Sequence, residues 1–246
     1  MKCLQGSGPV QIAVVCCPHG DELIGEIVFN HYQSIIHNFP GLRLIFANVQ
    51  AHTAGKRFVE SDLNRSFPGS ATGTHEEKLA HQIFPLISDA KYVLDLHTTT
   101  SDIVMTPIVA NLHPATRRIL NLTTSHEIAI MEPPIADHAL IGQVPAGVSL
   151  EFNRQYATTP AALTEITVII ANLLKNASQP ALNRRIFHVT GTIPKSYNLP
   201  SNAADFQPLT IPDLSPQPIY PFLLGEQAYA TQFHAFAATS VTANMI

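Results

Sequence analysis

Two side chains suited to binding a metal ion stand just after an apolar run of the chain. The run QIAVVCC covers residues 11–17, and the overlapping stretch CCPHGDE places His19 and Glu22 three residues apart. Side chains three apart at a helix start lie on the same side, so one ion can be reached by both. With His97 they make the His2Glu set that leaves zinc one open position for water or substrate. In a chain with 12 histidines the His19–Glu22 spacing also arises by chance, so its meaning depends on the elements that position it.

The elements around these residues predict an α/β fold. Three continuous apolar runs rich in β-branched residues are typical of strands buried on both faces. They cover 11–17, 42–48 and 91–97, and later strands are predicted at 103–110, 128–131 and 147–152. Helical patterns cover 22–36, 75–86 and 159–174. In the first helix, Leu23, Ile27 and Ile35 or Ile36 are expected to form one core-facing side. The alternation predicts a sheet with largely parallel neighbours.

This topology gives the candidate ligands a reason to meet. In open parallel sheets, ligands collect at the carboxyl ends of the strands. His19 and Glu22 follow one such end and His97 stands at another, so the three side chains converge if those strands are neighbours. Asp95 precedes His97 by two residues and points to the same side of its strand. It could therefore accept a hydrogen bond from a ligand imidazole.

The last part of the chain differs in character from the rest. After about residue 176 it is dense in proline and short apolar runs, with little helical period. Such composition is typical of edge strands and turns. We therefore expect an α/β domain over residues 1–178 and a small β-rich domain over 179–246.

Composition limits the partners and the compartment. The chain is 46% hydrophobic and 13% charged, as in folded proteins, and its net charge of -4 gives no long-range attraction to nucleic acid or an anionic membrane. No run approaches the roughly 20 apolar residues of a membrane span, and residues 1–10 lack the apolar core of a signal peptide. Three cysteines, two of them the adjacent Cys16 and Cys17, predict reduced thiols. We expect a cytoplasmic protein that binds a small molecule, and homo-oligomerisation stays open.

Two polar segments follow the first candidate ligands. KRFVESDLNRSFPG (56–69) brings together Arg57, Asn64 and Arg65 in a chain with few cations. Guanidinium groups hold carboxylates with paired hydrogen bonds, which indicates an acidic substrate, although a surface loop with an Arg/Asp bridge has the same composition. HEEKLAH (75–81) imitates the His-Glu-x-x-His motif, but position 79 is Leu and the second histidine lies off the face, so it is expected to be a solvated helix start.

Five stretches in chain order resemble one known family. HGDE, RFVESDLNRSFPG, DLHTT and VSLEF, followed by a weaker likeness in YPFLLGEQAYA, are similar to segments of the succinylglutamate desuccinylase and aspartoacylase family, relatives of the zinc carboxypeptidases. The resemblance implies a three-layer α/β/α carboxypeptidase-like domain with a mixed, largely parallel sheet, capped by a small C-terminal β domain. It also implies a zinc-dependent hydrolase that removes the acyl group from an N-acyl amino acid, with one Zn²⁺ per chain.

The resemblance also assigns roles residue by residue. The zinc ligands would be His19, Glu22 and His97, and the catalytic carboxylate Glu151. The substrate-binding positions would be Arg57, Asn64, Arg65 and, by the weaker match, Tyr229. Arg57 is in addition the candidate for stabilising the oxyanion of the tetrahedral intermediate.

Three departures from the family pattern stand out. Asn48 is followed by Val49 rather than the frequent proline, and Phe152 rather than glycine follows Glu151. Aspartoacylases have a further arginine about ten residues before the catalytic glutamate, where this chain has Ile141. Specificity for aspartate is therefore in question, unless Arg154 or Arg117 replaces that arginine.

Two other functions fit the same residues. One is a zinc carboxypeptidase or amidase acting on peptides or cell-wall fragments, which would need an open groove, whereas a β-rich segment folded over the cleft would admit only small substrates. The other is a noncatalytic relative that binds a metal or a small anion. Serine hydrolase chemistry is disfavoured because the chain has no Gly-x-Ser-x-Gly elbow.

Overall fold

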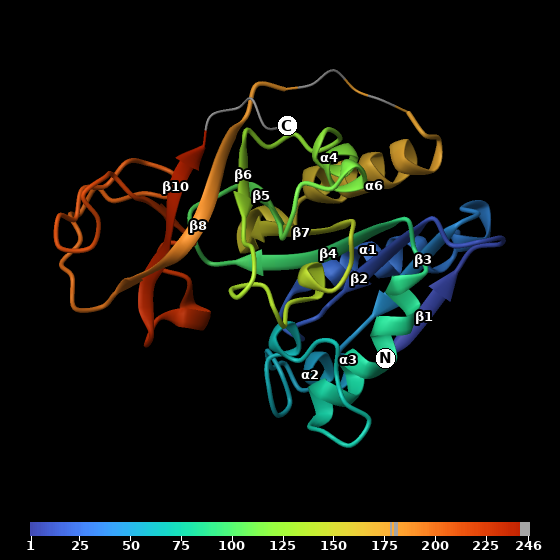
Figure 1. The fold of residues 1–246 in the computed structure, drawn as a ribbon. Helices are drawn as coiled ribbons and strands as arrows, with labels where there is room; N and C mark the ends of the chain where they lie inside the picture. Colours follow the sequence, from blue (N-terminus) through green and yellow to red (C-terminus); the bar gives the residue numbers. More distant parts are fainter. Residues whose placement is uncertain (178, 180–181, 242–246) are drawn as a thin grey trace.

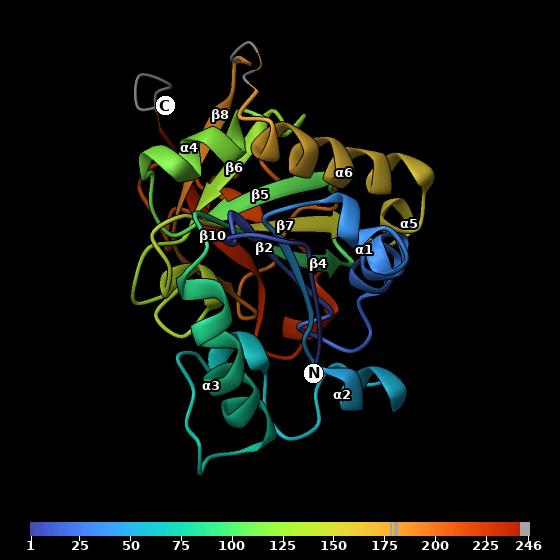
Figure 2. The ribbon, with the colours of Figure 1, turned by 90° about the vertical axis from the view of Figure 1, so that its right-hand side faces the viewer.

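The computed structural model describes residues 1–177, 179 and 182–241, which form one ten-stranded sheet with helices on both faces (Figures 1 and 2). The strand order is β1-β3-β2-β4-β7-β5-β6-β8-β10-β9. The strands are β1 (Lys2–Gln5), β2 (Ile12–Cys16), β3 (Leu42–Phe46), β4 (Tyr92–Thr99), β5 (Met105–Val109), β6 (Glu127–Ile130), β7 (Gly147–Asn153), β8 (Arg185–Pro194), β9 (Tyr220–Phe222) and β10 (Phe233–Val241). The three-layer architecture is confirmed.

The sheet consists of two parallel groups of strands joined by one antiparallel pair, with further antiparallel strands at its edges. β3, β2, β4 and β7 run parallel, and β5, β6 and β8 form a second parallel group. The two groups meet where β5 pairs antiparallel with β7. The mixed, largely parallel sheet was predicted, whereas β1 was not, because its four residues are too short and too exposed to show a buried-strand pattern.

Two apolar cores cover the two faces of the sheet. Within β2, Ile12, Val14 and Cys16 enter one core, and Ala13 and Val15 enter the other, as expected for a strand buried on both sides. Figure 2 shows α1, α4 and α6 on one face and α3 on the other. The helices are α1 (Leu23–Gln33), α2 (Val49–Thr53), α3 (His75–Ser88), α4 (Pro114–Leu120), α5 (Arg154–Ala157) and α6 (Pro160–Leu174), with 3-10 turns η1 (Ile36–Asn38), η2 (Leu63–Arg65), η3 (Leu140–Gly142) and η4 (Gln227–Tyr229).

The core-facing side of α1 differs from the predicted one. Leu23 is 45% exposed and Ile27 is only partly buried, whereas Ile24 and Val28 are fully buried. The helix begins one residue later than predicted, with Glu22 as its N-cap. A Cβ at Gly25 would lie 2.2 Å from the Cys17 amide nitrogen. This close approach of the helix to the end of β2 turns the Ile24 side inward and leaves Leu23 outside.

The C-terminal segment continues the sheet. β8 pairs in parallel with β6, and β10 and β9 follow antiparallel (Figure 1). A small apolar cluster that includes Ile193, Ile211 and Ile219 fills the space beneath its loops. The predicted C-terminal strands are present. The division into domains 1–178 and 179–246 stays a prediction, and residues 178, 180–181 and 242–246 lie outside the described part. Within that part, no helix is long and apolar enough to span a membrane.

Candidate active site

The predicted ligands meet because their strands are neighbours in the sheet. β2 pairs in parallel with β4, so the turn that carries His19 and Glu22 lies beside the end of β4 that carries His97. β4 pairs in turn with β7, and the register places His97 opposite Glu151. A Cβ at Gly20 would lie 2.3 Å from the Ala51 carbonyl carbon, so glycine lets the ligand turn pack against α2.

His19, Glu22 and His97 form a compact group of donor atoms. The His19 Nδ1 lies 2.8 Å from Glu22 Oε1, and the His97 Nδ1 lies 3.2 Å from Glu22 Oε2. One ligand atom from each residue falls within 4.8 Å of the others. All three side chains are buried, with relative exposures of 2%, 1% and 4%. This arrangement suits one small cation shielded from bulk water.

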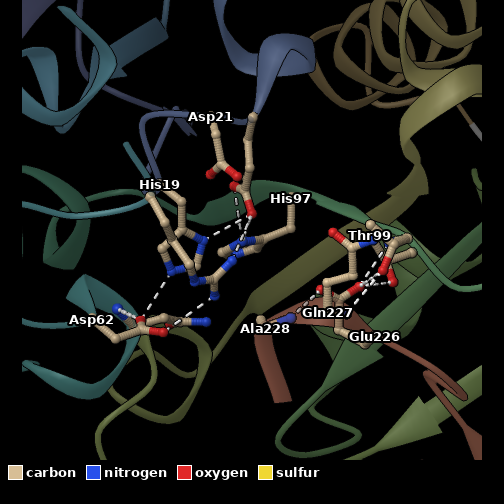
Figure 3. A network of polar contacts seen from close by, with 12 residues as sticks. His19, Asp21, Asp62, His97, Thr99, Glu226, Gln227 and Ala228 are labelled. Atoms are coloured by element: carbon tan, nitrogen blue, oxygen red, sulfur yellow. Dashed lines mark hydrogen bonds and ion pairs between the residues drawn. The ribbon is translucent and has the colours of Figure 1, made fainter. Parts of the chain in front are cut away.

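A carboxylate contacts the Nε2 atom of each imidazole ring. The His19 Nε2 lies 2.9 Å from Asp62 Oδ1 (Figure 3). The His97 Nε2 lies 2.7 Å from Asp95 Oδ2. With a metal ion bound, such contacts would keep the proton of each ring on Nε2 and leave the lone pair of Nδ1 for the ion. Asp95 was predicted from its position in the strand. Asp62 was missed, although it stands in the same polar segment as Arg57, because nothing in the local pattern shows that this loop reaches His19.

The charges around the centre favour a cation. Burial opposes protonation of His97, but the carboxylates of Asp95 and Glu22 hold its pKa well above the usual value. Burial also opposes ionisation of Glu22, yet His19 and His97 hold its pKa below the usual range. The imidazole protons thus compensate for buried negative charge. A divalent cation among the same atoms would supply that positive charge more effectively.

Arg57 lies beside the ligand carboxylate. Its guanidinium is 3.2 Å from Asp62 Oδ2 and 3.7 Å from Glu22 Oε1. The loop that follows is held by the buried carboxylate of Glu76, which accepts hydrogen bonds from the amides of residues 59–61 and from Asn48 Nδ2. The prediction of a solvated helix start is therefore wrong at Glu76, whose side chain is fully buried. The motif has a structural role because it anchors the Arg57 loop.

Asn64 and Arg65 lie on η2, where Asn64 contacts η3 and Arg65 contacts the C-terminal segment. Asn64 Oδ1 accepts a hydrogen bond from the Leu140 amide at 3.0 Å. An Arg65 Nη donates to the Tyr229 hydroxyl at 3.1 Å, across 164 positions of the chain. These residues line one cavity together with His19, Glu22, Arg57, His97 and Glu151. Each predicted binding or catalytic residue thus borders the same space.

Glu151 lines this cavity, and its carboxyl group has a raised pKa. Burial raises its pKa to about 7, the positive charge of His97 opposes this shift, and the negative charges of Glu22 and Glu226 add to it. Its side chain is only 9% exposed. A carboxylate with a pKa near neutrality can accept and return a proton at physiological pH.

Glu226 fastens the C-terminal segment to the end of β4. Its carboxylate accepts hydrogen bonds from the Thr99 hydroxyl, from the Thr100 amide at 2.7 Å and from the Ala228 amide at 2.9 Å (Figure 3). These bonds hold η4, and with it Tyr229, against the strand that carries His97. Sequence reasoning missed Glu226, because its partners lie more than 120 positions earlier.

The two arginines considered as replacements for the family arginine lie elsewhere. Arg154 forms an ion pair with Asp21 at 2.6 Å, and the Arg117 Nε donates to the Leu112 carbonyl. Neither is among the described residues that line the site cavities. Ile141 does line one of them, and neither of the two arginines that the sequence left open as replacements borders the site.

The profile of the succinylglutamate desuccinylase/aspartoacylase catalytic domain matches residues 9–177. The chain belongs to this family. The match covers the ligand turn, the Arg57–Arg65 segment, β4 and Glu151, which are the elements that the structure brings together. It ends before the segment that carries Glu226 and Tyr229.

Curated relatives share parts of this region. The chain is 33% identical over 130 residues to a "Probable aspartoacylase" of Acaryochloris marina, covering 47% of this chain and 44% of that protein. It is 29% identical over 153 residues to an "N-acyl-aromatic-L-amino acid amidohydrolase (carboxylate-forming)" of Xenopus tropicalis, covering 56% and 48%. The matched part thus spans less than half the length of these relatives.

Solved structures of the family share the fold over nearly the whole chain. Murine aminoacylase 3 superposes with a TM-score of 0.75 at 17% identity, covering 95% of this chain and 96% of that one. The succinylglutamate desuccinylase of Chromobacterium violaceum superposes with a TM-score of 0.73 at 19% identity, covering 96% and 86%. At these identities the likeness establishes the architecture.

Proposed function

We propose that this protein is a zinc-dependent deacylase that cleaves the amide bond of a small N-acyl amino acid. One observation carries the proposal: the buried His19–Glu22–His97 group, the raised-pKa Glu151 and the Arg65–Tyr229 pair border a single cavity. Metal ligands, a proton acceptor and an anion-binding group are what hydrolysis of an acidic amide needs. Membership of a family with aspartoacylases and amino-acid amidohydrolases supports the same reaction.

The donor set fits Zn²⁺. Two imidazole nitrogens and one carboxylate are the ligands of many catalytic zinc sites, and they leave a position for water or substrate. The carboxylates of Asp62 and Asp95 hold the outer nitrogens of both rings, as is usual around zinc. Bound there, Zn²⁺ would lower the pKa of a water toward about 7 and polarise the scissile carbonyl.

The protein's own side chains would perform the remaining steps. Glu151 takes a proton from the attacking water and passes it to the leaving nitrogen, so one carboxyl group serves both transfers. Arg57 stabilises the negative oxygen of the tetrahedral intermediate, a contact that strengthens as charge develops. Asn64, Arg65 and Tyr229 hold the substrate carboxylate and so place the scissile bond at the metal.

The closed shape of the site favours small substrates over peptides. The turn η4 lies over the cavity, with Glu226 bonded to Thr99 and Thr100 and with Tyr229 bonded to Arg65. A peptide or cell-wall fragment needs an open groove. The noncatalytic alternative is disfavoured because the three ligands and Glu151 are all present and share one cavity.

Metal analysis followed by a substrate screen tests the proposal. The purified protein is expected to contain about one zinc per chain, measured by plasma mass spectrometry after dialysis. Loaded with zinc, it is expected to release free amines from a panel of N-acyl amino acids, detected with ninhydrin. Release of amines only from peptides would favour the carboxypeptidase or amidase alternative. Tight zinc binding without hydrolysis of any panel member would favour the noncatalytic one.

Replacing Glu226 tests the role of η4 and the acidity of Glu151 together. Glu226→Gln loses charge-assisted hydrogen bonds worth about 1.5–3 kcal/mol each, so Tyr229 is held less firmly and KM is expected to rise about tenfold or more. Removing a negative charge near Glu151 lowers the pKa of that group. Since the base must be ionised, the falling acid limb of kcat/KM is expected to move to lower pH.

The exposed Glu132 provides the matched control for this charge change. Glu132→Gln alters the same chemical group away from the cavity and is expected to leave both KM and the pH profile unchanged. If Glu226→Gln behaves like Glu132→Gln in both measurements, η4 does not position the substrate.

A further inference from the structure

A second cavity opens from the candidate active site and has a different chemistry. One end is bordered by polar residues of the site, including Asn64, Arg65, Glu151 and Tyr229. The other end is apolar, and its walls come from β5, the segment after β6, η3 and β10. The apolar lining includes Ile108, Met131, Ile135, Ala139, Ile141 and Phe236. A ligand that fills both ends must carry a polar group and an apolar group on neighbouring atoms.

The structure connects the two ends through Asn64. Its Oδ1 accepts a hydrogen bond from the Leu140 amide at 3.0 Å, which fixes η3 beside the residues assigned to the substrate carboxylate. The next residue, Ile141, is 3% exposed and lines the apolar end. In an amino acid, the carboxylate and the side chain share one carbon. When the substrate carboxylate binds at Asn64 and Arg65, the side chain of the substrate therefore points toward Ile141.

The acyl group meets different surroundings. It is attached to the nitrogen at the scissile bond, which the proposed chemistry places at His97 and Glu151. At this point lies the first cavity, that of the candidate active site. Its lining is mostly polar and includes Glu22, Arg57, Thr98 and Glu226. A short acyl group fits this lining, whereas a long apolar one would leave these polar groups without water or partners.

We propose that the apolar cavity binds an aliphatic side chain of the amino-acid part of the substrate, with Ile141 as a specificity-determining residue. This inference rests on the proposed deacylase function. Among the described residues that line the cavity, Arg65 is the only lysine or arginine, and it is assigned to the substrate's main-chain carboxylate, whereas His97 is assigned to the metal. A side-chain carboxylate would lie at the apolar end without a charged partner, which is strongly unfavourable.

The cavity size narrows the side chain further. The whole cavity, including its polar end, holds about 50 Å³. At roughly 10–15 Å³ for each water-sized group, this sets an upper limit of about four such groups for the side chain. The side chains of valine and leucine have three and four carbons, whereas an aromatic side chain is larger. We therefore expect branched aliphatic amino acids to fit best.

A matched pair of substrate panels tests the inference. In the first, the acyl group is acetyl and the amino acid is Val, Leu, Phe or Asp; in the second, the amino acid is Leu and the acyl group is acetyl, hexanoyl or succinyl. The zinc-loaded protein is expected to show kcat/KM for N-acetyl-leucine at least 100-fold above that for N-acetyl-aspartate, and to prefer acetyl to hexanoyl. Calorimetry with the Glu151→Gln variant, which leaves the compounds intact, should give the same order of affinities for the members of both panels.

Two variants locate the preference at Ile141. Ile141→Ala enlarges the cavity and is expected to raise the kcat/KM ratio of N-acetyl-phenylalanine to N-acetyl-valine about tenfold or more. Ile83→Ala makes the same change at a fully buried position on α3 that does not line the cavity, so it controls for lost packing and should leave the ratio unchanged. An unchanged ratio in Ile141→Ala would overturn the role of this residue.

The outcomes separate this inference from the proposed function. Hydrolysis with N-acetyl-aspartate preferred, or with hexanoyl preferred over acetyl, overturns the aliphatic side-chain site and leaves the deacylase function standing. Neither binding nor hydrolysis of any N-acyl amino acid by protein that contains zinc overturns the function, and the inference falls with it.

Discussion

Glu151→Gln is expected to retain zinc and to lose nearly all turnover. Glutamine keeps the size and polarity of the side chain in its buried position, but it cannot take a proton from water. General acid–base catalysis contributes roughly 10²–10⁴-fold, and Glu151 would serve in both proton transfers, so kcat is expected to fall by about 10³-fold or more. The measurement is kcat for the preferred N-acyl amino acid together with zinc content by plasma mass spectrometry.

A glutamate outside the site controls for the chemical change. Glu127 lies at the start of β6 and pairs with Arg185, so Glu127→Gln makes the same substitution without touching the candidate ligands. It is expected to keep wild-type kcat. A Glu151→Gln variant with normal turnover would remove Glu151 from the mechanism. Loss of zinc in that variant would instead indicate that Glu151 supports the metal.

His19→Ala is expected to lose the metal and, with it, all activity. The change removes one of three ligands and leaves the buried Glu22 and the carboxylate of Asp62 without the imidazole between them. Two remaining ligands hold zinc weakly, so affinity is expected to fall by at least 100-fold. Zinc per chain after dialysis and the dissociation constant from competition with a chelator measure the loss.

His126 provides the comparison for this variant. It is exposed and its ring contacts only the Asn183 carbonyl among the described interactions. His126→Ala is expected to keep one zinc per chain. Because His19→Ala leaves negative charges facing one another, its fold is checked by circular dichroism, and His97→Ala serves as a second test of the same centre. Full zinc occupancy in both folded variants would refute the proposed site.

The local parts of the fold could be predicted because each depends on neighbouring residues. Continuous apolar runs identified the strands β2, β3, β4, β5, β6 and β7, and the period of the apolar residues identified α1, α3 and α6. The spacing of His19 and Glu22, and the strand alternation that puts Asp95 beside His97, are also local relations. The prediction failed at Leu23 because α1 packs with Gly25 against Cys16 and Cys17, which places Ile24 and Val28, not Leu23, in the core.

Contacts between distant segments could not be predicted in this way. Asp62 reaches His19 across 43 positions, and Glu226 reaches Thr99 across 127. The sequence pattern of neither segment indicates these partners. They depend on the strand order, on the Glu76 anchor that places the Arg57 loop, and on the extension of the sheet through β8 and β10.

Residue types and their order were thus enough to indicate an α/β fold with a candidate metal centre, because ligand chemistry, helix spacing and strand burial are properties of short stretches. The shape of the substrate cavity was decided only in three dimensions. Ile141 in the sequence showed that an arginine was missing, but only the structure shows that Ile141 lines a cavity together with Asn64 and Phe236. The cavity is lined by residues from several strands and turns, so its polarity and size depend on how these elements pack together.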